Sequence, residues 1–352
     1  MECCWVGIDI RRIKMKNLIL SYVENIFSKQ GISNILECFL PALLKLQARK
    51  WIPIVIYHSV DIDTTNPLIT GKIHNIEPKM FYHQCCLLKK YYTIVPIDEL
   101  AKRVKERKKV HKLAAITFDD GYASVLRNAV PVLEELNIPA TFFLSTKLVQ
   151  SGAFWRDKVR YVINQNLVGE FLRFAGDLDP VFKLIHPEKF YRDTKNPSIV
   201  NSHLMEVILD EFLMHKGVAL TNYAQDVYCT TRCLTIKRFS NLTFGNHSHS
   251  HYVLSSMNRD EQYREILTAK KVLQNMKLPL SRLFAIPFGG MRDFNSDTLD
   301  ILRDLDYSGY VLSSGGRVVN AVVDTNDMKE NNDLIVLRRF MQANKRLFLF
   351  EE

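Results

Sequence analysis

The sequence lacks a hydrophobic run long enough to cross a membrane. Its most apolar N-terminal stretch, residues 35–46, is interrupted by a glutamate and a proline, whereas a membrane helix needs about 20 mainly apolar residues. A secretory signal is not evident either, because Glu24 and Lys29 break the apolar segment that follows the first basic residues. We expect a cytoplasmic or membrane-peripheral protein. A helix over residues 16–27 could lie on a membrane surface or dock on the main domain.

A disulfide framework is also absent. The seven cysteines are odd in number and include two adjacent pairs, which is not the pattern of a disulfide-linked fold. Cys229 and Cys233 have the spacing of a weak metal or redox pair, but no second pair completes a tetrahedral site. Free thiols in a reducing compartment are therefore expected.

Dense positive charge is scarce as well. The net charge is +9, yet the basic residues are scattered, and the one dense run, residues 102–109, has the register of a solvated helix face. We therefore expect no nucleic-acid partner. Hydrophobic residues make up 47% of the chain, which is enough for a sizeable core in one large domain or two ordinary ones.

Strands and helices alternate from about residue 52 onward, after an N-terminal helical extension over residues 1–50. This alternation predicts β/α units around a parallel sheet or barrel. Residues 155–240 break the rhythm and are expected to form a helical insertion. The expected strands are residues 52–57, 93–97, 113–118, 140–145, 242–245, 283–287, 309–313 and 334–337. The expected helices are residues 81–90, 99–109 capped by Asp98, 123–136, 259–276 with a capping box from Asn258 to Glu261, and 296–305.

Two adjacent carboxylates, Asp119 and Asp120, follow the apolar strand expected over residues 113–118. Desolvation and mutual repulsion both oppose their ionisation at such a position. A bound cation would remove this difficulty, with one aspartate as a ligand and the other handling protons. The competing interpretation is a plain strand-to-turn corner, because Asp-Asp-Gly is ordinary turn chemistry.

A second polar group follows the strand expected over residues 242–245. His247 and His251 are four residues apart, so both imidazoles can converge on one metal, while His249 points elsewhere in a helical geometry. Two histidines and one carboxylate form a three-ligand site with open positions, as in hydrolytic metal centres. Such a metal activates water and polarises a carbonyl. The alternative is a flexible polar loop.

These motifs resemble those of the polysaccharide deacetylases. The resemblance rests on Thr117-Phe118-Asp119-Asp120-Gly121 followed by His247-Ser248-x-x-His251, and it extends from about Pro53 to Arg339. Further segments resemble the family in the right order: Val55 to Val60, Pro139 to Leu144, Phe154-Trp155-x-Asp157 and Phe284 to Gly289. The first of these resembles the opening strand of the biofilm-glycan deacetylase branch.

The resemblance implies an α/β fold, a distorted, incomplete (β/α)7-type barrel known as the NodB-homology fold, spanning residues 51–352. It implies that Asp120, His247 and His251 bind a divalent metal, usually zinc, with cobalt or nickel as alternatives. Asp119 would be the general base acting on water at the metal. The oxyanion would be held by the metal and by the backbone N–H of Tyr122. The site would lie at the C-terminal ends of the strands.

The chain departs from the family pattern at two places. Ala285 stands where many members have an arginine that orients the base, and Arg338 or Arg339 is a candidate replacement by position. No Leu-x-His-Asp stretch supplies the general acid. His58 resembles the acid of the biofilm-glycan branch in its place on the first strand, so we expect it to protonate the leaving amine, although it could merely hydrogen-bond at the strand end.

The expected function is metal-dependent removal of acetyl groups from N-acetylated sugars of a polysaccharide or glycolipid. A related amidase acting on another non-peptide C–N bond and a catalytically degenerate glycan-binding protein are the alternatives. Three aromatic side chains are candidates for a sugar-stacking floor, although each could equally belong to the core. The expected substrate-binding residues are Tyr122, Trp155, Pro287, Phe288 and Arg338.

Overall fold

The computed structural model describes residues 52–62, 65–71, 74–150, 153–224, 226–236, 239–313 and 334–341. The expected N-terminal extension, with its surface helix, lies outside these residues. They fall within one of the two compact units of the chain, Lys50–Glu352. Within this described part, every helix is too short or too polar to traverse a bilayer.

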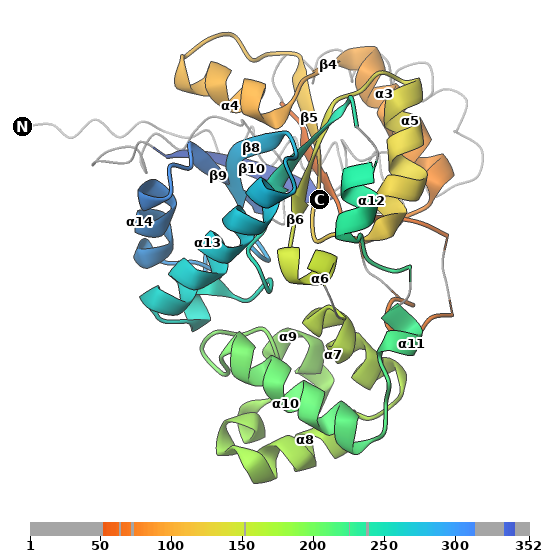
Figure 1. Ribbon diagram of the computed structural model, residues 1–352, viewed down its shortest axis with the longest axis vertical. Helices are drawn as coiled ribbons and strands as arrows, with labels where there is room; N and C mark the ends of the chain where they lie inside the picture. The colour runs from red at the N-terminus through yellow and green to blue at the C-terminus, as the bar shows by residue number, and fades with distance from the viewer. Residues whose placement is uncertain are drawn as a thin grey trace, which may run out of the picture. The chain divides into compact units, whose positions relative to one another are not determined.

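Seven parallel strands form a nearly closed barrel, which confirms the predicted fold (Figure 1). Their order is β1-β10-β9-β8-β7-β6-β5, and β1 also pairs with β5. The strands are β1 (Ile54–Tyr57), β5 (Leu113–Phe118), β6 (Ala140–Leu144), β7 (Leu242–Asn246), β8 (Leu280–Ala285), β9 (Gly309–Ser313) and β10 (Ile335–Met341). The short β4 (Thr93–Ile94) extends the sheet beside β5, and β2 (Ser59–Val60) pairs separately with β3 (Asn75–Ile76).

The strands read as continuous apolar runs because they are covered on both faces. All residues of β1, β5 and β6 are buried. The covering helices are α3 (Pro78–Tyr91), α4 (Ile97–Lys105), the π-helical turn η1 (Val125–Ala129) leading into α5 (Val130–Glu135), α6 (Thr146–Gln150), α13 (Arg259–Asn275) and α14 (Ser296–Asp304).

Helix α4 closes the N-terminal end of the barrel. Its buried Ile97 and Leu100 belong to one apolar cluster with Leu113 and Ile335, which begin two of the strands. Because this end is filled by apolar side chains, polar chemistry is confined to the opposite end, where the strands terminate.

The capping box from Asn258 to Glu261 is confirmed, but several local predictions were wrong. Pro96, not Asp98, is the N-cap of α4, and the Asp98 carboxylate instead accepts a hydrogen bond from the backbone N–H of Arg282 at 2.8 Å. Strand β8 begins at Leu280 and ends before Pro287, whereas β10 continues to Met341 because it pairs with both β9 and β1.

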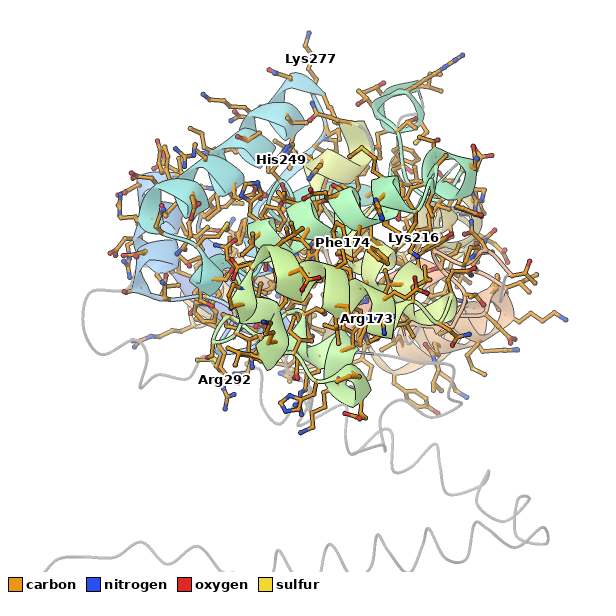
Figure 2. All side chains as sticks on the ribbon, turned by 90° about the horizontal axis from the view of Figure 1, so that it is seen from below. Arg173, Phe174, Lys216, His249, Lys277 and Arg292 are labelled. Atoms are coloured by element: carbon orange, nitrogen blue, oxygen red, sulfur yellow. The ribbon has the colours of Figure 1, made fainter. Side chains whose placement is uncertain are left out.

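The region between β6 and β7 is helical among the residues that the structure describes. Its elements are α7 (Trp155–Asn164), α8 (Val168–Leu178), η2 (Pro180–Leu184), η3 (Pro187–Lys189), α9 (Phe190–Asp193), α10 (Ser202–His215), α11 (Thr221–Ala224) and α12 (Thr231–Ile236). Helices α7 to α10 form a lobe beyond α6 (Figure 1). Figure 2 views this lobe from below, with the exposed Arg173 and Lys216 labelled.

A buried carboxylate fastens the lobe to the barrel. Asp157 of α7 accepts hydrogen bonds from the hydroxyls of Tyr122 and Tyr228, and it pairs with Arg160 one helical turn later. Tyr122 directly follows the Asp119-Asp120-Gly121 turn. The lobe and the loop after β5 are therefore held in one fixed arrangement.

Candidate metal centre and active site

Strand register brings the predicted site residues together. Tyr57 of β1 pairs with Phe118 of β5, so His58 and Asp119, the next residue on each strand, lie side by side. His247 directly follows β7. All these residues therefore lie at the C-terminal ends of barrel strands, where such folds place chemistry.

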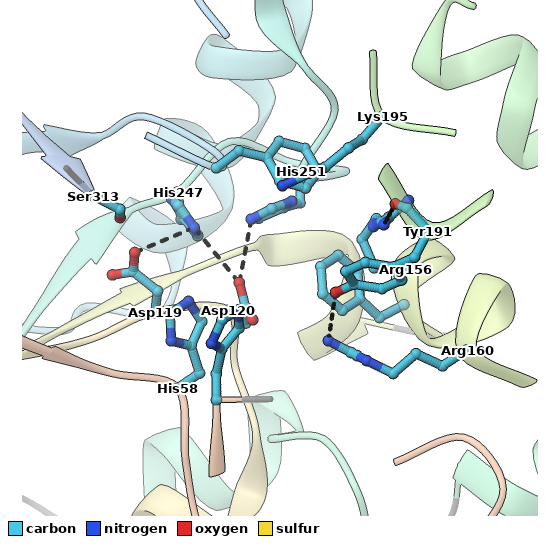
Figure 3. A pocket seen from close by; sticks show the side chains of 13 residues that line it. His58, Asp119, Asp120, Arg156, Arg160, Tyr191, Lys195, His247, His251 and Ser313 are labelled. Carbon is cyan, nitrogen blue, oxygen red and sulfur yellow. Dashed lines mark hydrogen bonds and ion pairs between the residues drawn. The ribbon is translucent and has the colours of Figure 1, made fainter. Parts of the chain in front are cut away.

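Asp120, His247 and His251 form a compact group, as the sequence predicted (Figure 3). One ligand atom from each lies within 4.8 Å of the others. The Asp120 Oδ1 atom is 3.3 Å from His251 Nε2 and 3.6 Å from His247 Nε2. Zinc bonds of about 2.0 Å place two tetrahedral ligand atoms roughly 3.3 Å apart, so this spacing fits one shared ion.

The second nitrogen of His247 fixes the tautomer that a metal needs. His247 Nδ1 lies 2.9 Å from the carbonyl oxygen of Ala285. A carbonyl can only accept, so Nδ1 carries the proton and the Nε2 lone pair faces Asp120. Ala285 thus orients the His247 ring through its backbone carbonyl.

An unsatisfied buried atom also fits a cation at this place. Asp120 Oδ1 has no hydrogen-bond partner among the described residues, although the side chain is buried, and such an atom calls for an explanation. Burial lowers the pKa of His251 to about 4, which leaves a neutral imidazole at neutral pH. Burial opposes ionisation of Asp120, yet the adjacent histidines hold its pKa well below the usual range. Burial opposes protonation of His247, but the charges of Asp119 and Asp120 outweigh it and raise its pKa. The protonation states of Asp120 and His251 therefore suit metal binding.

Strained backbone is concentrated in this site. Asp120, His251 and Phe288 have φ angles of 75°, 58° and 63°, a left-handed region that costs non-glycine residues about 1–3 kcal/mol each. Neighbours hold His251 in place: its backbone N–H donates to Ser248 Oγ, and its carbonyl accepts from Trp155 Nε1, both at 3.0 Å. Trp155 is buried, and its indole N–H holds the backbone of His251.

Asp119 is paired with Arg339 rather than Arg338. Both carboxylate oxygens of Asp119 accept hydrogen bonds from the Arg339 guanidinium at 2.6 Å, and the two side chains are 1% and 0% exposed. Arg338 is exposed because successive residues of β10 point to opposite faces. Burial opposes ionisation of Asp119, but Arg339 and His247 outweigh it and lower the pKa. Asp119 is therefore an oriented, ionised carboxylate.

His58 lines the same pocket beside an unexpected second histidine. Its ring lies 5.0 Å from the ring of His74, and its Nδ1 has no hydrogen-bond partner among the described residues. Burial lowers the pKa of His58, whereas the charges of Asp120 and Asp119 oppose that shift. His74 stands just before β3, outside every motif recognised in the sequence.

The expected substrate-binding residues are only partly brought together. Phe288 is half-buried and lines the pocket. Tyr122, Trp155 and Pro287 are buried and do not line it, and Arg338 is exposed elsewhere. The side chains of Tyr122 and Trp155 instead bind Asp157 and His251, so they support the site.

The lobe contributes pocket residues that the sequence analysis missed. Arg156, Arg160, Tyr191 and Lys195 line the side of the pocket away from Asp119 (Figure 3). The remaining histidine of the predicted motif, His249, lies outside the pocket, with its Nδ1 2.9 Å from the Thr146 hydroxyl. The pocket thus has a side that carries the candidate metal ligands and a cationic side.

The chain is similar in sequence to known polysaccharide deacetylases. The family model described as polysaccharide deacetylase matches residues 106–170 and 209–310. Over 108 residues the chain is 30% identical to the putative polysaccharide deacetylase YxkH of Bacillus subtilis (strain 168), a match that covers 31% of this chain and 37% of that relative.

Two solved structures show the same fold. The Streptococcus pyogenes deacetylase PplD in complex with acetate aligns with a TM-score of 0.51 and 16% identity, covering 82% of this chain and 91% of that one. A de-N-acetylase from Aggregatibacter actinomycetemcomitans aligns with a TM-score of 0.50 and 13% identity, covering 85% of this chain and 99% of that one.

Proposed function

We propose that the chain is a metal-dependent hydrolase that removes acetyl groups from N-acetylated sugars of a polysaccharide or glycolipid. The match of residues 106–170 and 209–310 to the polysaccharide deacetylase family model supports this proposal. The observation that carries this proposal is the position of a buried, arginine-paired carboxylate against a three-ligand group. His247 Nε2 lies 3.5 Å from Asp119 and 3.6 Å from Asp120. One carboxylate is thus available as a base while the other binds the ion.

Asp120, His247 and His251 would hold a divalent ion, for which zinc suits two imidazoles and one carboxylate. When bound, the ion supplies a Lewis acid that polarises the acetamide carbonyl and activates water. Asp119 accepts the proton of the attacking water, and Arg339 keeps this carboxylate ionised and oriented. His58 donates a proton to the departing nitrogen, so that acetate and a free amine leave.

The degenerate glycan-binding alternative rested on two missing residues. Arg339 occupies the arginine role for Asp119, and His58 lies in the pocket where an acid is needed. These positions favour an enzyme over a binding protein.

The direct test is acetate release from chitooligosaccharides by zinc-loaded protein. We expect one zinc per chain, loss of acetate release with a chelator, and recovery with added zinc. His251→Ala should bind less zinc, whereas His249→Ala, which removes a histidine outside the group, should bind as much as the wild type. Tight zinc binding without acetate release from any acetylated sugar would favour the binding alternative, and turnover of small amides alone would favour the amidase.

The acid role of His58 predicts a dependence on the leaving group. His58→Gln should slow release of acetate from an amide, whose nitrogen needs a proton, by about 10²-fold or more. Hydrolysis of 4-nitrophenyl acetate should change little, because nitrophenolate leaves without a proton. Equal losses on both substrates would instead assign His58 a positioning role.

A further inference from the structure

The cationic side of the pocket holds charge that the fold does not neutralise. Arg156 is 2% exposed, and its guanidinium donates to Thr194 Oγ1 at 2.8 Å and to the carbonyl of Tyr191 at 2.5 Å, both neutral acceptors. Its Nε atom has no partner among the described residues. Arg160, in contrast, is paired with Asp157.

Lys195 adds a second positive charge beside Arg156. Its Nζ lies 4.8 Å from the centroid of the Phe288 ring, and that ring lies 4.6 Å from the ring of the metal-ligand candidate His251. Lys195 makes no ion pair within 4.0 Å in the part of the chain that the structure describes. The nearby Asp293 carboxylate accepts the backbone N–H of Gly290 at 2.7 Å instead.

The Arg156 guanidinium remains cationic at neutral pH. Burial lowers the pKa of Arg156 to about 10, which still leaves the guanidinium charged. Burying such a charge without a counter-ion is strongly unfavourable. Aromatic contacts with Tyr191 at 4.3 Å and Trp155 at 4.8 Å ease this cost but bring no negative charge.

We propose that Arg156 and Lys195 form a subsite for an anionic substituent, a carboxylate or a phosphate ester, on the acetylated sugar. This inference rests on the proposed function, because the subsite faces the same pocket as the metal-ligand group. A guanidinium and an ammonium beside an aromatic ring recognise both anions through charge-assisted hydrogen bonds. Tyr191 and Lys195 lie between the two segments that the family model matches, residues 106–170 and 209–310.

Three sugars distinguish the sources of the charge: N-acetylglucosamine is neutral, N-acetylmuramic acid carries a carboxylate, and N-acetylglucosamine 6-phosphate carries a phosphate. Their dissociation constants would be measured by calorimetry with zinc-loaded Asp119→Asn protein. We expect one of the anionic sugars to bind about tenfold or more tightly than the neutral sugar. Lys195→Met in the same background should remove most of that preference.

Lys189→Met is the matched control, because it removes the same charge from an exposed position of the same lobe. It should leave the preference unchanged. Equal binding of all three sugars would overturn the subsite, and so would a preference that survives Lys195→Met, because the anion would then be held elsewhere. Arg156→Gln should act like Lys195→Met if it folds. Because binding is measured without turnover, an absence of acetate release would reject the proposed function while leaving this test intact.

Discussion

Replacing Asp119 with asparagine is expected to lower kcat for acetate release by about 10²–10⁴-fold, the usual contribution of a general base. The amide has nearly the shape of the carboxylate but cannot accept the proton of the attacking water. Zinc content should stay near that of the wild type, because Asp120, His247 and His251 form the ligand group.

The control for this variant is its own metal content and circular dichroism spectrum. Loss of activity together with loss of zinc would mean that Asp119 contributes to metal binding rather than to proton transfer. A variant with full activity and full zinc content would remove Asp119 from the mechanism.

Replacing Arg339 with glutamine is expected to reduce both stability and activity. The buried Asp119 carboxylate would lose its counter-charge, and breaking a buried ion pair in this way costs about 3–5 kcal/mol in the free energy of unfolding. Without Arg339 the pKa of Asp119 rises, so the rise of kcat/KM with pH should shift to higher pH. Urea denaturation and a pH series of kcat/KM measure the two effects.

The stability difference should also depend on pH in a defined direction. Pairing with Arg339 lowers the folded-state pKa of Asp119, so its stabilisation is present above the unfolded value of about 4 and is lost as pH falls through the folded value. Wild type and Arg339→Gln should therefore converge in acid.

Arg338→Gln is the matched control, because it removes the same side chain from the exposed face of the same strand. It should change the unfolding free energy by less than about 0.5 kcal/mol. If the two variants are equally stable and equally active, the Asp119–Arg339 pair contributes neither to stability nor to catalysis.

The sequence predicted the parts of the site whose chemistry is local. Two adjacent aspartates after an apolar strand, together with two histidines four residues apart, leave few alternative interpretations of the site. The structure brings Asp120, His247 and His251 together. Arg339 could not be separated from Arg338 in advance. The choice depends on which of the two side chains of β10 points into the barrel. Pairing of β10 with β9 and β1 decides this, rather than the residues themselves.

No local sequence motif marked the residues of the lobe that line the pocket. Arg156 lies in a helix whose sequence pattern indicates only amphipathic packing, and Lys195 follows a short helix in a polar stretch.

The roles of the aromatic residues were ambiguous for a related reason. Tyr122 and Trp155 carry both an apolar body and one donor, so the same residue types serve a sugar-stacking surface or a buried hydrogen bond. Their partners, Asp157 and His251, decided the outcome.

The Asp119–Arg339 pair joins residues 220 positions apart in the chain. A ribosome releases the chain from its N-terminal end at about 5–20 residues per second, so Asp119 and both histidines emerge well before Arg339. In the nascent protein, Asp120, His247 and His251 can therefore come together while Asp119 still lacks the counter-charge of Arg339. Insertion of β10 is thus the step that supplies Arg339 to Asp119, and we expect a product that ends before residue 339 to be inactive.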